Sequence, residues 1–103
     1  MGYRFNLLFF WLSDVDLAIS RVAERVRRGG HHIPEPVIRR RYRAGLVNLQ
    51  SLYLPIADQW KVYDNSRSGS PVLVASGEKS GIIRIYERKT WDEIQEGGTD
   101  ASE

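Results

Sequence analysis

Apolar residues fill the segment from Phe5 to Leu12, FNLLFFWL, almost without interruption. A short run without alternation is typical of a strand that is buried on both faces, as in a parallel sheet with helices on either side. Ser13 follows as a candidate helix N-cap, and Asp16 stands three residues further on, as in a capping box. The pattern therefore predicts a buried strand that leads directly into a helix, which is the first half of a β-α-β unit.

Two long helices are predicted after this strand. The apolar positions of the first recur at helical spacing and are Val15, Ile19, Val22 and Val26. Gly29 and Gly30 follow and predict its end, because glycine commonly stands just past a helix C-terminus. Pro36 suits the first turn of the second helix, which is expected to run to about Ala57, with Pro55 kinking or ending it.

The remainder of the chain predicts short strands. They cover residues 60–66, 72–76 and 82–89, the last two as a strand pair. Thr90 is a candidate cap for a short final helix. Residues 1–95 are predicted to form one domain, and residues 96–103 a disordered tail.

Two long helices are too few to cover both faces of a sheet around a strand that is buried on both sides. The fold class expected is therefore α/β, as a partial three-layer fold of the kind that one part of a larger domain would have. Incomplete cover leaves apolar surface exposed, and large exposed apolar patches mark sites of association. We expect the chain alone to form homo-oligomers or to be poorly soluble.

Positive charge is concentrated in one part of the chain. The formal net charge is only +2, yet eight arginines lie between positions 21 and 43, opposed there by Glu24 and Glu35 alone. Such a local excess indicates one anionic partner at one place rather than general polyanion binding. The chain has no cysteine, so it forms no disulfide. No apolar run approaches the length of a membrane span, so we expect a cytoplasmic protein without a membrane partner.

The arginines allow three interpretations. A solvated helix face is the simplest, but like charges at i, i+4, such as Arg21 with Arg25, repel one another. A basic helix after a turn can instead enter the major groove of DNA, although the connection from Gly30 to Pro36 is long for that motif. In the third, the two helices form a mobile lid whose planar guanidinium groups bind phosphoryl oxygens.

The sequence evidence for other candidate sites is weaker. GEKSG, residues 77–81, lacks the glycine spacing of a phosphate loop and lies between strands, so it predicts a hairpin turn. His31 and His32, with Glu35 nearby, lack the spacing of a metal site, and no metal is expected. Residues 64–66, DNS, end a strand where ligands lie in open α/β sheets, although the sequence alone favours a structural Asx-type turn at this position.

Two segments carry a resemblance to a known family. RVAERVRRGGHHIPEPVIRRRYRAGLVNL, with a strand and helix start before it, and WKVYDNS after it resemble the C-terminal half of zeta-toxin-family P-loop kinases. The likeness is closer to the bacterial branch labelled predicted ABC-type ATPase, and it covers roughly residues 2 to 95. It implies a P-loop kinase fold that phosphorylates a small molecule with ATP and Mg²⁺. In the toxins of the family the substrate is a UDP-activated amino sugar, and an antitoxin is a partner.

The resemblance also implies roles for particular residues. Arg21 matches the first lid arginine, which contacts nucleotide phosphates and the transferred group. The role of the second lid arginine is shared by Arg25, Arg28 and His31. Further phosphate contacts are implied for the cluster Arg39, Arg40 and Arg41. The turn that lies near the adenine in the family matches Asp64, Asn65 and Ser66.

The chain departs from the family in one respect. The phosphate loop, its Mg²⁺-binding hydroxyl and the acidic catalytic base have no counterpart among the 103 residues. We therefore expect the isolated chain to be inactive and to need an N-terminal half for binding nucleotide and substrate. The alternative is a small basic nucleic-acid-binding protein that uses the same arginines.

Overall fold

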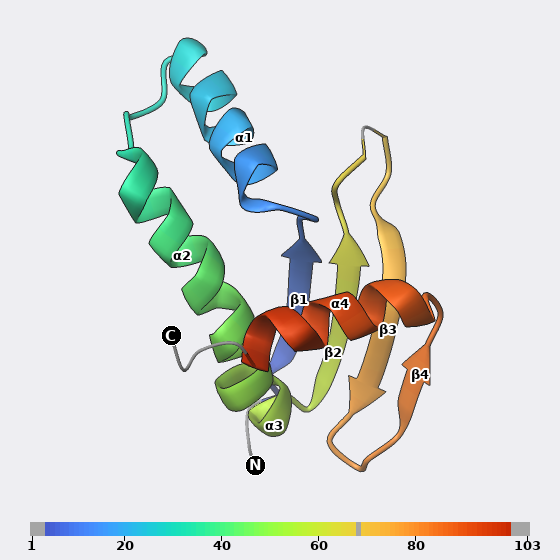
Figure 1. Ribbon diagram of the computed structural model, residues 1–103. Coiled ribbons are helices and arrows are strands. Elements are labelled where there is room, and N and C mark those ends of the chain that lie inside the picture. Colours follow the sequence, from blue (N-terminus) through green and yellow to red (C-terminus); the bar gives the residue numbers. More distant parts are fainter. Residues whose placement is uncertain (1–3, 68, 100–103) are drawn as a thin grey trace.

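The computed structural model describes residues 4–67 and 69–99, and within them it has a mixed α/β fold (Figure 1). Its four strands form one sheet in the order β1-β2-β3-β4. The strands are β1 (Asn6–Trp11), β2 (Gln59–Asp64), β3 (Val72–Glu78) and β4 (Ile83–Ile85). The helices are α1 (Val15–Arg27), α2 (Glu35–Asn48), the π-helix η1 (Leu49–Tyr53), α3 (Leu54–Ile56) and α4 (Arg88–Thr99).

The first two strands are parallel, as the strand-to-helix pattern predicts. β1 pairs with β2 in parallel from Asn6 opposite Gln59 to Trp11 opposite Asp64, and the helices α1 to α3 connect the two strands. β2, β3 and β4 then follow as an antiparallel meander, which confirms the predicted pairing of the last two strands. The carboxyl ends of β1 and β2 therefore lie side by side at one edge of the sheet.

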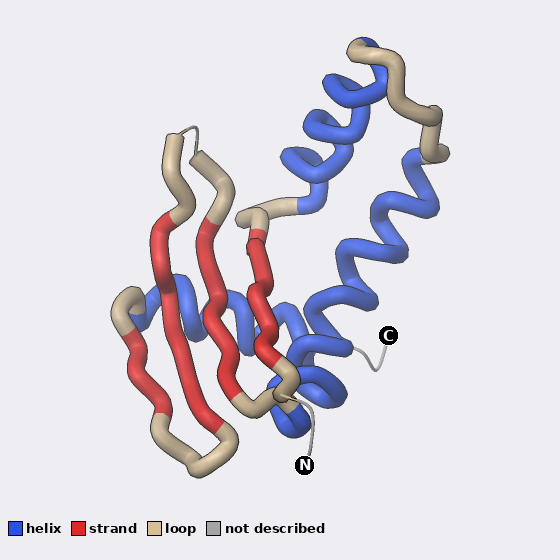
Figure 2. The backbone as a smooth tube through the Cα atoms, turned by 180° about the vertical axis from the view of Figure 1, so that it is seen from behind, coloured by secondary structure: helices blue, strands red, loops and turns tan. Residues whose placement is uncertain are grey.

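The prediction that β1 is buried on both faces is wrong. Leu7, Phe9 and Trp11 point toward the helices, whereas Leu8 and Phe10 are 58% and 49% exposed. The reason is that α4 crosses one face of the sheet, while the other face is open when seen from behind (Figures 1 and 2). Because successive side chains of a strand point to opposite faces, a one-sided helix layer buries every second residue.

The core lies between the sheet and α4. Trp60 of β2 stacks on Trp91 of α4, with ring centroids 5.5 Å apart and planes 11° from parallel. Gly77 of β3 leaves the space that the Trp60 ring occupies, since a Cβ at this position would come within 2.4 Å of that ring. Leu49, Val62, Val74 and Ile94 are fully buried around this pair.

The helices α1 and α2 form a hairpin that projects beyond the sheet (Figure 1). α1 has no buried residue, so its apolar stripe is covered by α2 only in part. The predicted end of α1 is confirmed: Gly29 has φ of +102°, and the Gly30 N–H donates to the Arg25 carbonyl at 2.9 Å. The hairpin thus has a sharply defined tip, and it joins the core through α2, where Leu46 is buried, rather than through α1.

The second predicted helix runs nearly as far as expected, but its form changes on the way. Pro36 lies in its first turn, and the helical segment ends at Ile56 as α2 passes into η1 and α3. Pro55 has no N–H to donate to the Ser51 carbonyl, and its ring crowds that carbonyl. The wider π-turn before it accommodates the proline without ending the helix.

Two predicted boundaries near the C-terminus are wrong. The last strand covers only residues 83–85, and Thr90 lies inside α4, which begins at Arg88. α4 continues to Thr99, so residues 96–99 of the predicted disordered tail are helical, while 100–103 lie outside the described residues. Gly97 permits close approach of α4 to α2, since a Cβ there would lie 3.0 Å from Leu46 Cδ1.

Candidate functional site

The carboxyl ends of β1 and β2 are joined by hydrogen bonds between residues far apart in the sequence. The Asn65 N–H donates to the Trp11 carbonyl at 2.8 Å, which extends the parallel ladder by one step. The Ser13 N–H donates to Ser66 Oγ, also at 2.8 Å. The loop that enters α1 and the turn that leaves β2 are therefore held against each other at this edge of the sheet.

The turn at residues 64–66 has the Asx geometry that its sequence allows. Asp64 Oδ1 accepts a hydrogen bond from the Ser66 N–H at 2.9 Å, which fixes the turn. Asp64 also lines a small cavity of about 130 Å³ together with Arg67, Glu87 and Thr90. The carboxylate of Asp64 thus shapes the backbone of the turn and at the same time borders free space next to it.

Arg21 lies next to this turn. Its Nη2 donates to the Ser66 carbonyl at 3.3 Å, and the side chain is half-buried. Within residues 4–67 and 69–99 its guanidinium has no carboxylate partner. A guanidinium carries five N–H donors, so most of those of Arg21 remain available at the carboxyl edge of the parallel strands. The structure thus brings together Arg21 and the 64–66 turn, which the sequence analysis had selected separately.

The other predicted lid residues lie further from the sheet. Arg25 and Arg28 follow Arg21 at i+4 and i+7, so all three lie on one flank of α1. At a rise of 1.5 Å per residue, Arg28 is about 10 Å beyond Arg21 along the helix. Arg28 forms an ion pair with Glu24 at 3.3 Å, and His31 is exposed in the loop at the hairpin tip.

Arg39 has a structural role in the hairpin. Its guanidinium bonds Glu35 at 2.9 Å and reaches Asp16 of α1 at 3.2 Å, so it ties α2 to the first turn of α1. The hydrogen bond that Arg39 donates to Glu35 raises the pKa of Arg39, so this group stays charged. Arg40 is exposed and borders a hollow of about 370 Å³ with Arg39 and Arg43.

A larger cavity, of about 520 Å³, opens beside the same strand end and was missed by the sequence analysis. Ser13, Asp14, Tyr42, Arg43 and Glu93 line it with residues of α1, α2 and α4. Its polar side chains come from the loop before α1 and from the helices α2 and α4, so no local sequence pattern predicts it.

Tyr42 fixes one wall of this cavity. Its hydroxyl donates to the Leu12 carbonyl at 2.6 Å, which ties α2 to the end of β1. Burial raises the pKa of Tyr42, and the negative charge of Asp14 adds to the effect. Asp14 itself caps α1, accepting from the Leu17 N–H at 2.8 Å. The neutral hydroxyl is thus the form that holds the wall in place.

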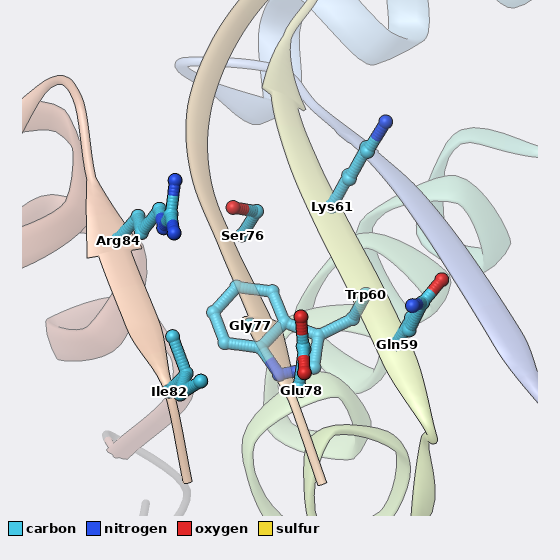
Figure 3. Close-up of a pocket in the computed structure, with 8 residues that line it drawn as sticks. All are labelled: Gln59, Trp60, Lys61, Ser76, Gly77, Glu78, Ile82 and Arg84. Atoms are coloured by element: carbon cyan, nitrogen blue, oxygen red, sulfur yellow. The ribbon is translucent and has the colours of Figure 1, made fainter. Parts of the chain in front are cut away.

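A different hollow, of about 300 Å³, lies over β2, β3 and β4. Figure 3 shows Lys61 and Arg84 on either side of Ser76, and the strand register places these three residues in one row across the sheet. Gly77 and Glu78 of the GEKSG segment line it, but none of the residues selected for nucleotide contacts does. Lys79 and Ser80, which belong to the GEKSG segment, form the turn between β3 and β4, as predicted.

Comparison with known protein families, with curated proteins and with solved structures found no match to this chain. Among the described residues, no group of three or more histidine or acidic side chains is arranged to hold a metal ion. In the same part of the chain, no helix is both long and apolar enough to cross a membrane. The geometry at the carboxyl ends of β1 and β2 is therefore the basis on which a function is proposed.

Proposed function

We propose that this chain is the nucleotide-lid and adenine-side part of an ATP-dependent small-molecule kinase of the zeta-toxin kind. The observation that carries the proposal is the contact of Arg21 with the Ser66 carbonyl, which sets a lid arginine against the turn proposed to lie near the adenine. Ligands of open α/β sheets lie outside the carboxyl ends of parallel strands, and this contact lies there.

The proposed roles follow the placement of the residues. Arg21, closest to the sheet, contacts nucleotide phosphates, and Arg25 and Arg28 extend the same basic flank toward the substrate side. His31, at the hairpin tip, closes over the transferred group. In phosphoryl transfer, charge spreads over the equatorial oxygens, and an arginine stabilises it without moving a proton. The backbone of residues 64–66 borders the adenine.

Arg39 is removed from the proposed nucleotide contacts, because its ion pairs with Asp16 and Glu35 hold the hairpin together. Arg40 remains a candidate phosphate contact through its exposed position on α2. In the complete enzyme Mg²⁺ would supply positive charge that neutralises the phosphates. The groups that hold the ion, together with the phosphate loop and the base, belong in this proposal to a complementary segment.

A hydroxyl of the small molecule is the acceptor of the phosphoryl group, and a UDP-activated amino sugar is the substrate class proposed. The cavity beside Ser13 and Tyr42 contains both acidic and basic side chains, which suits a polar ligand of this kind. The proposal places the enzyme in the cytoplasm, where ATP is supplied, and gives it an antitoxin as a regulatory partner.

The test is nucleotide binding in the presence of the complementary segment. A polypeptide with a strand and a phosphate loop is co-expressed with this chain, and ATP affinity is measured by calorimetry. We expect Arg21→Ala to weaken binding about 10- to 100-fold, as the loss of a charge-assisted hydrogen bond would. Arg84→Ala is the matched control, since Arg84 is exposed on β4 and has no role in the proposal. Equal affinity for the wild type and Arg21→Ala would refute the proposed role.

A further inference from the structure

The outer edge of β1 is unusual for the border of a sheet. Within the described residues β1 pairs only with β2, so its other edge has no strand partner. From Phe5 to Leu12 the sequence has neither a charged residue nor a proline. Edge strands of self-contained domains normally carry lysine, proline or a bulge, because an open ladder otherwise pairs with another chain. The irregularity in this sheet lies between β2 and β3, away from the open edge.

The backbone groups that face outward can be identified. The carbonyls of Phe5 and Trp11 accept hydrogen bonds from residues 58, 59 and 65 beside β2. In a parallel pair the residues that face the partner strand alternate with those that face away. Asn6, Leu8 and Phe10 therefore direct their N–H and C=O groups toward the open edge.

The same three residues also point to the open face of the sheet. Leu8 is 58% exposed, and Phe10 stacks on Tyr63 of β2 with ring centroids 5.3 Å apart. Phe5, at the amino end of the strand, and Ile56 of α3, two residues before Asp58, are exposed as well. Free backbone groups and exposed apolar side chains therefore coincide along one strand.

The helices limit which kind of chain can pair with the open edge of β1. The α1–α2 hairpin stands beyond the β1 edge of the sheet in both views (Figures 1 and 2). Two-fold pairing of β1 with a second copy would bring each hairpin against the helices of the other copy. A single extended segment has no such hairpin, and it can lie beside β1 with α2 next to it.

We propose that the outer edge of β1 is a strand-addition site for an uncharged extended segment of a second polypeptide, with apolar residues on both faces. The inference rests on the proposed function in one respect, since a kinase built from this chain needs a complementary segment, and this edge is where that segment joins. Main-chain hydrogen bonds to Asn6, Leu8 and Phe10 supply affinity, and contact with the exposed faces of Leu8 and Phe10 supplies selectivity for apolar partners.

The test uses a capped eight-residue peptide, Thr-Val-Val-Thr-Thr-Val-Val-Thr, as the probe, because this order places valine on both faces of an extended chain. Its control has the same composition but carries N-methyl groups on alternate amides, so that it cannot pair. Amide exchange of the full chain is followed by NMR. We expect the probe, and not its control, to slow exchange at Asn6, Leu8 and Phe10 at least tenfold, with little change at Leu7 and Phe9.

Two variants separate the backbone from the side chain. Leu8→Pro removes a backbone N–H that points to the open edge, and an edge strand tolerates a proline at such a position. The variant should bind the probe about 5- to 10-fold more weakly. Leu8→Thr keeps that N–H and should stay within about threefold of the wild type. Fluorescence of the stacked Trp60–Trp91 pair reports whether each variant is folded.

Three results would overturn the proposal. In the first, the probe does not slow amide exchange at Asn6, Leu8 and Phe10. In the second, these amides already exchange slowly without the probe at every protein concentration. In the third, their exchange slows as the concentration of the chain alone rises. The last result would assign the edge to a second copy. If the probe binds as expected but a phosphate-loop segment joined at this edge confers no ATP binding, the docking site stands and the proposed kinase function is refuted.

Discussion

Nη2 of Arg21, in the middle of α1, donates a hydrogen bond to the main-chain carbonyl of Ser66, 45 positions away in the sequence, at 3.3 Å. This bond links the hairpin to the turn after β2. Because α1 has no buried residue, the position of α1 depends on polar contacts such as this one and on its packing against α2, whose Leu46 belongs to the core. Loss of the bond is therefore expected to affect α1 more than the sheet.

Arg21→Ala should loosen the hairpin. The loss of one hydrogen bond to a half-buried carbonyl costs about 0.5–1.5 kcal/mol. We expect amide exchange in α1 to accelerate by up to roughly tenfold, with exchange in β2 and β3 unchanged. Hydrogen exchange read by mass spectrometry measures this, and Arg25→Ala, one turn further along the same flank, is the control. Uniform acceleration across the sheet would instead mean that the contact supports the whole fold.

Tyr42 should make stability fall at high pH. Its folded-state pKa is raised, so the folded protein favours the neutral phenol that donates to the Leu12 carbonyl. The unfolded chain ionises first, at about pH 10. Stability from this group is therefore complete below that pH and is lost as the pH rises through the folded-state pKa.

Thermal unfolding of Tyr42→Phe provides the comparison. The variant lacks the hydroxyl, so it should be less stable than the wild type at pH 8 by about 0.5–1.5 kcal/mol. The difference should shrink as the pH rises above about 10, as the wild type loses its contribution. A constant difference over this range would contradict the assignment.

Gly77 and Gly45 should respond oppositely to alanine. At Gly77 a Cβ would overlap the Trp60 ring, so Gly77→Ala should destabilise the fold by about 1–3 kcal/mol or more. Gly45 lies in α2 with open space around it, so Gly45→Ala should stabilise by about 0.5–1 kcal/mol. Chemical denaturation of the two variants side by side measures both. Equal effects would mean that the Trp60–Gly77 contact does not hold in solution.

The alternative of nucleic-acid binding makes a separate prediction. Arg27 and Arg28 are paired with Glu24, and Arg39 with Glu35, so part of the basic surface is already neutralised. We expect only weak binding of duplex DNA, with dissociation constants of about 10⁻⁴ to 10⁻⁶ M at physiological salt. Fluorescence anisotropy across a salt series measures this. Nanomolar binding with a steep salt slope would favour the alternative over the kinase.

Local patterns in the sequence determined much of the fold. Helical spacing of apolar residues predicted α1, and paired glycines predicted its end, because these features depend only on nearby residues. The strand-to-helix pattern at Phe5 predicted the parallel pairing of β1 with β2. The predicted end of the final helix was wrong, and the part of α4 beyond it packs against α2, since a Cβ at Gly97 would lie 3.0 Å from Leu46 Cδ1. Neither the pattern nor the composition contains that contact.

The sequence by itself selected Arg21 and the 64–66 turn as candidates, since an unbalanced arginine and a polar strand end are visible in the printed residues. Only the tertiary structure decided that they touch, that Arg39 is committed to ion pairs, and that Tyr42 walls a cavity. It also showed that the apolar run FNLLFFWL is half exposed. The apolar composition of a strand limits how much apolar surface it can bury. The number of helix layers packed on the sheet decides how much of that surface is buried.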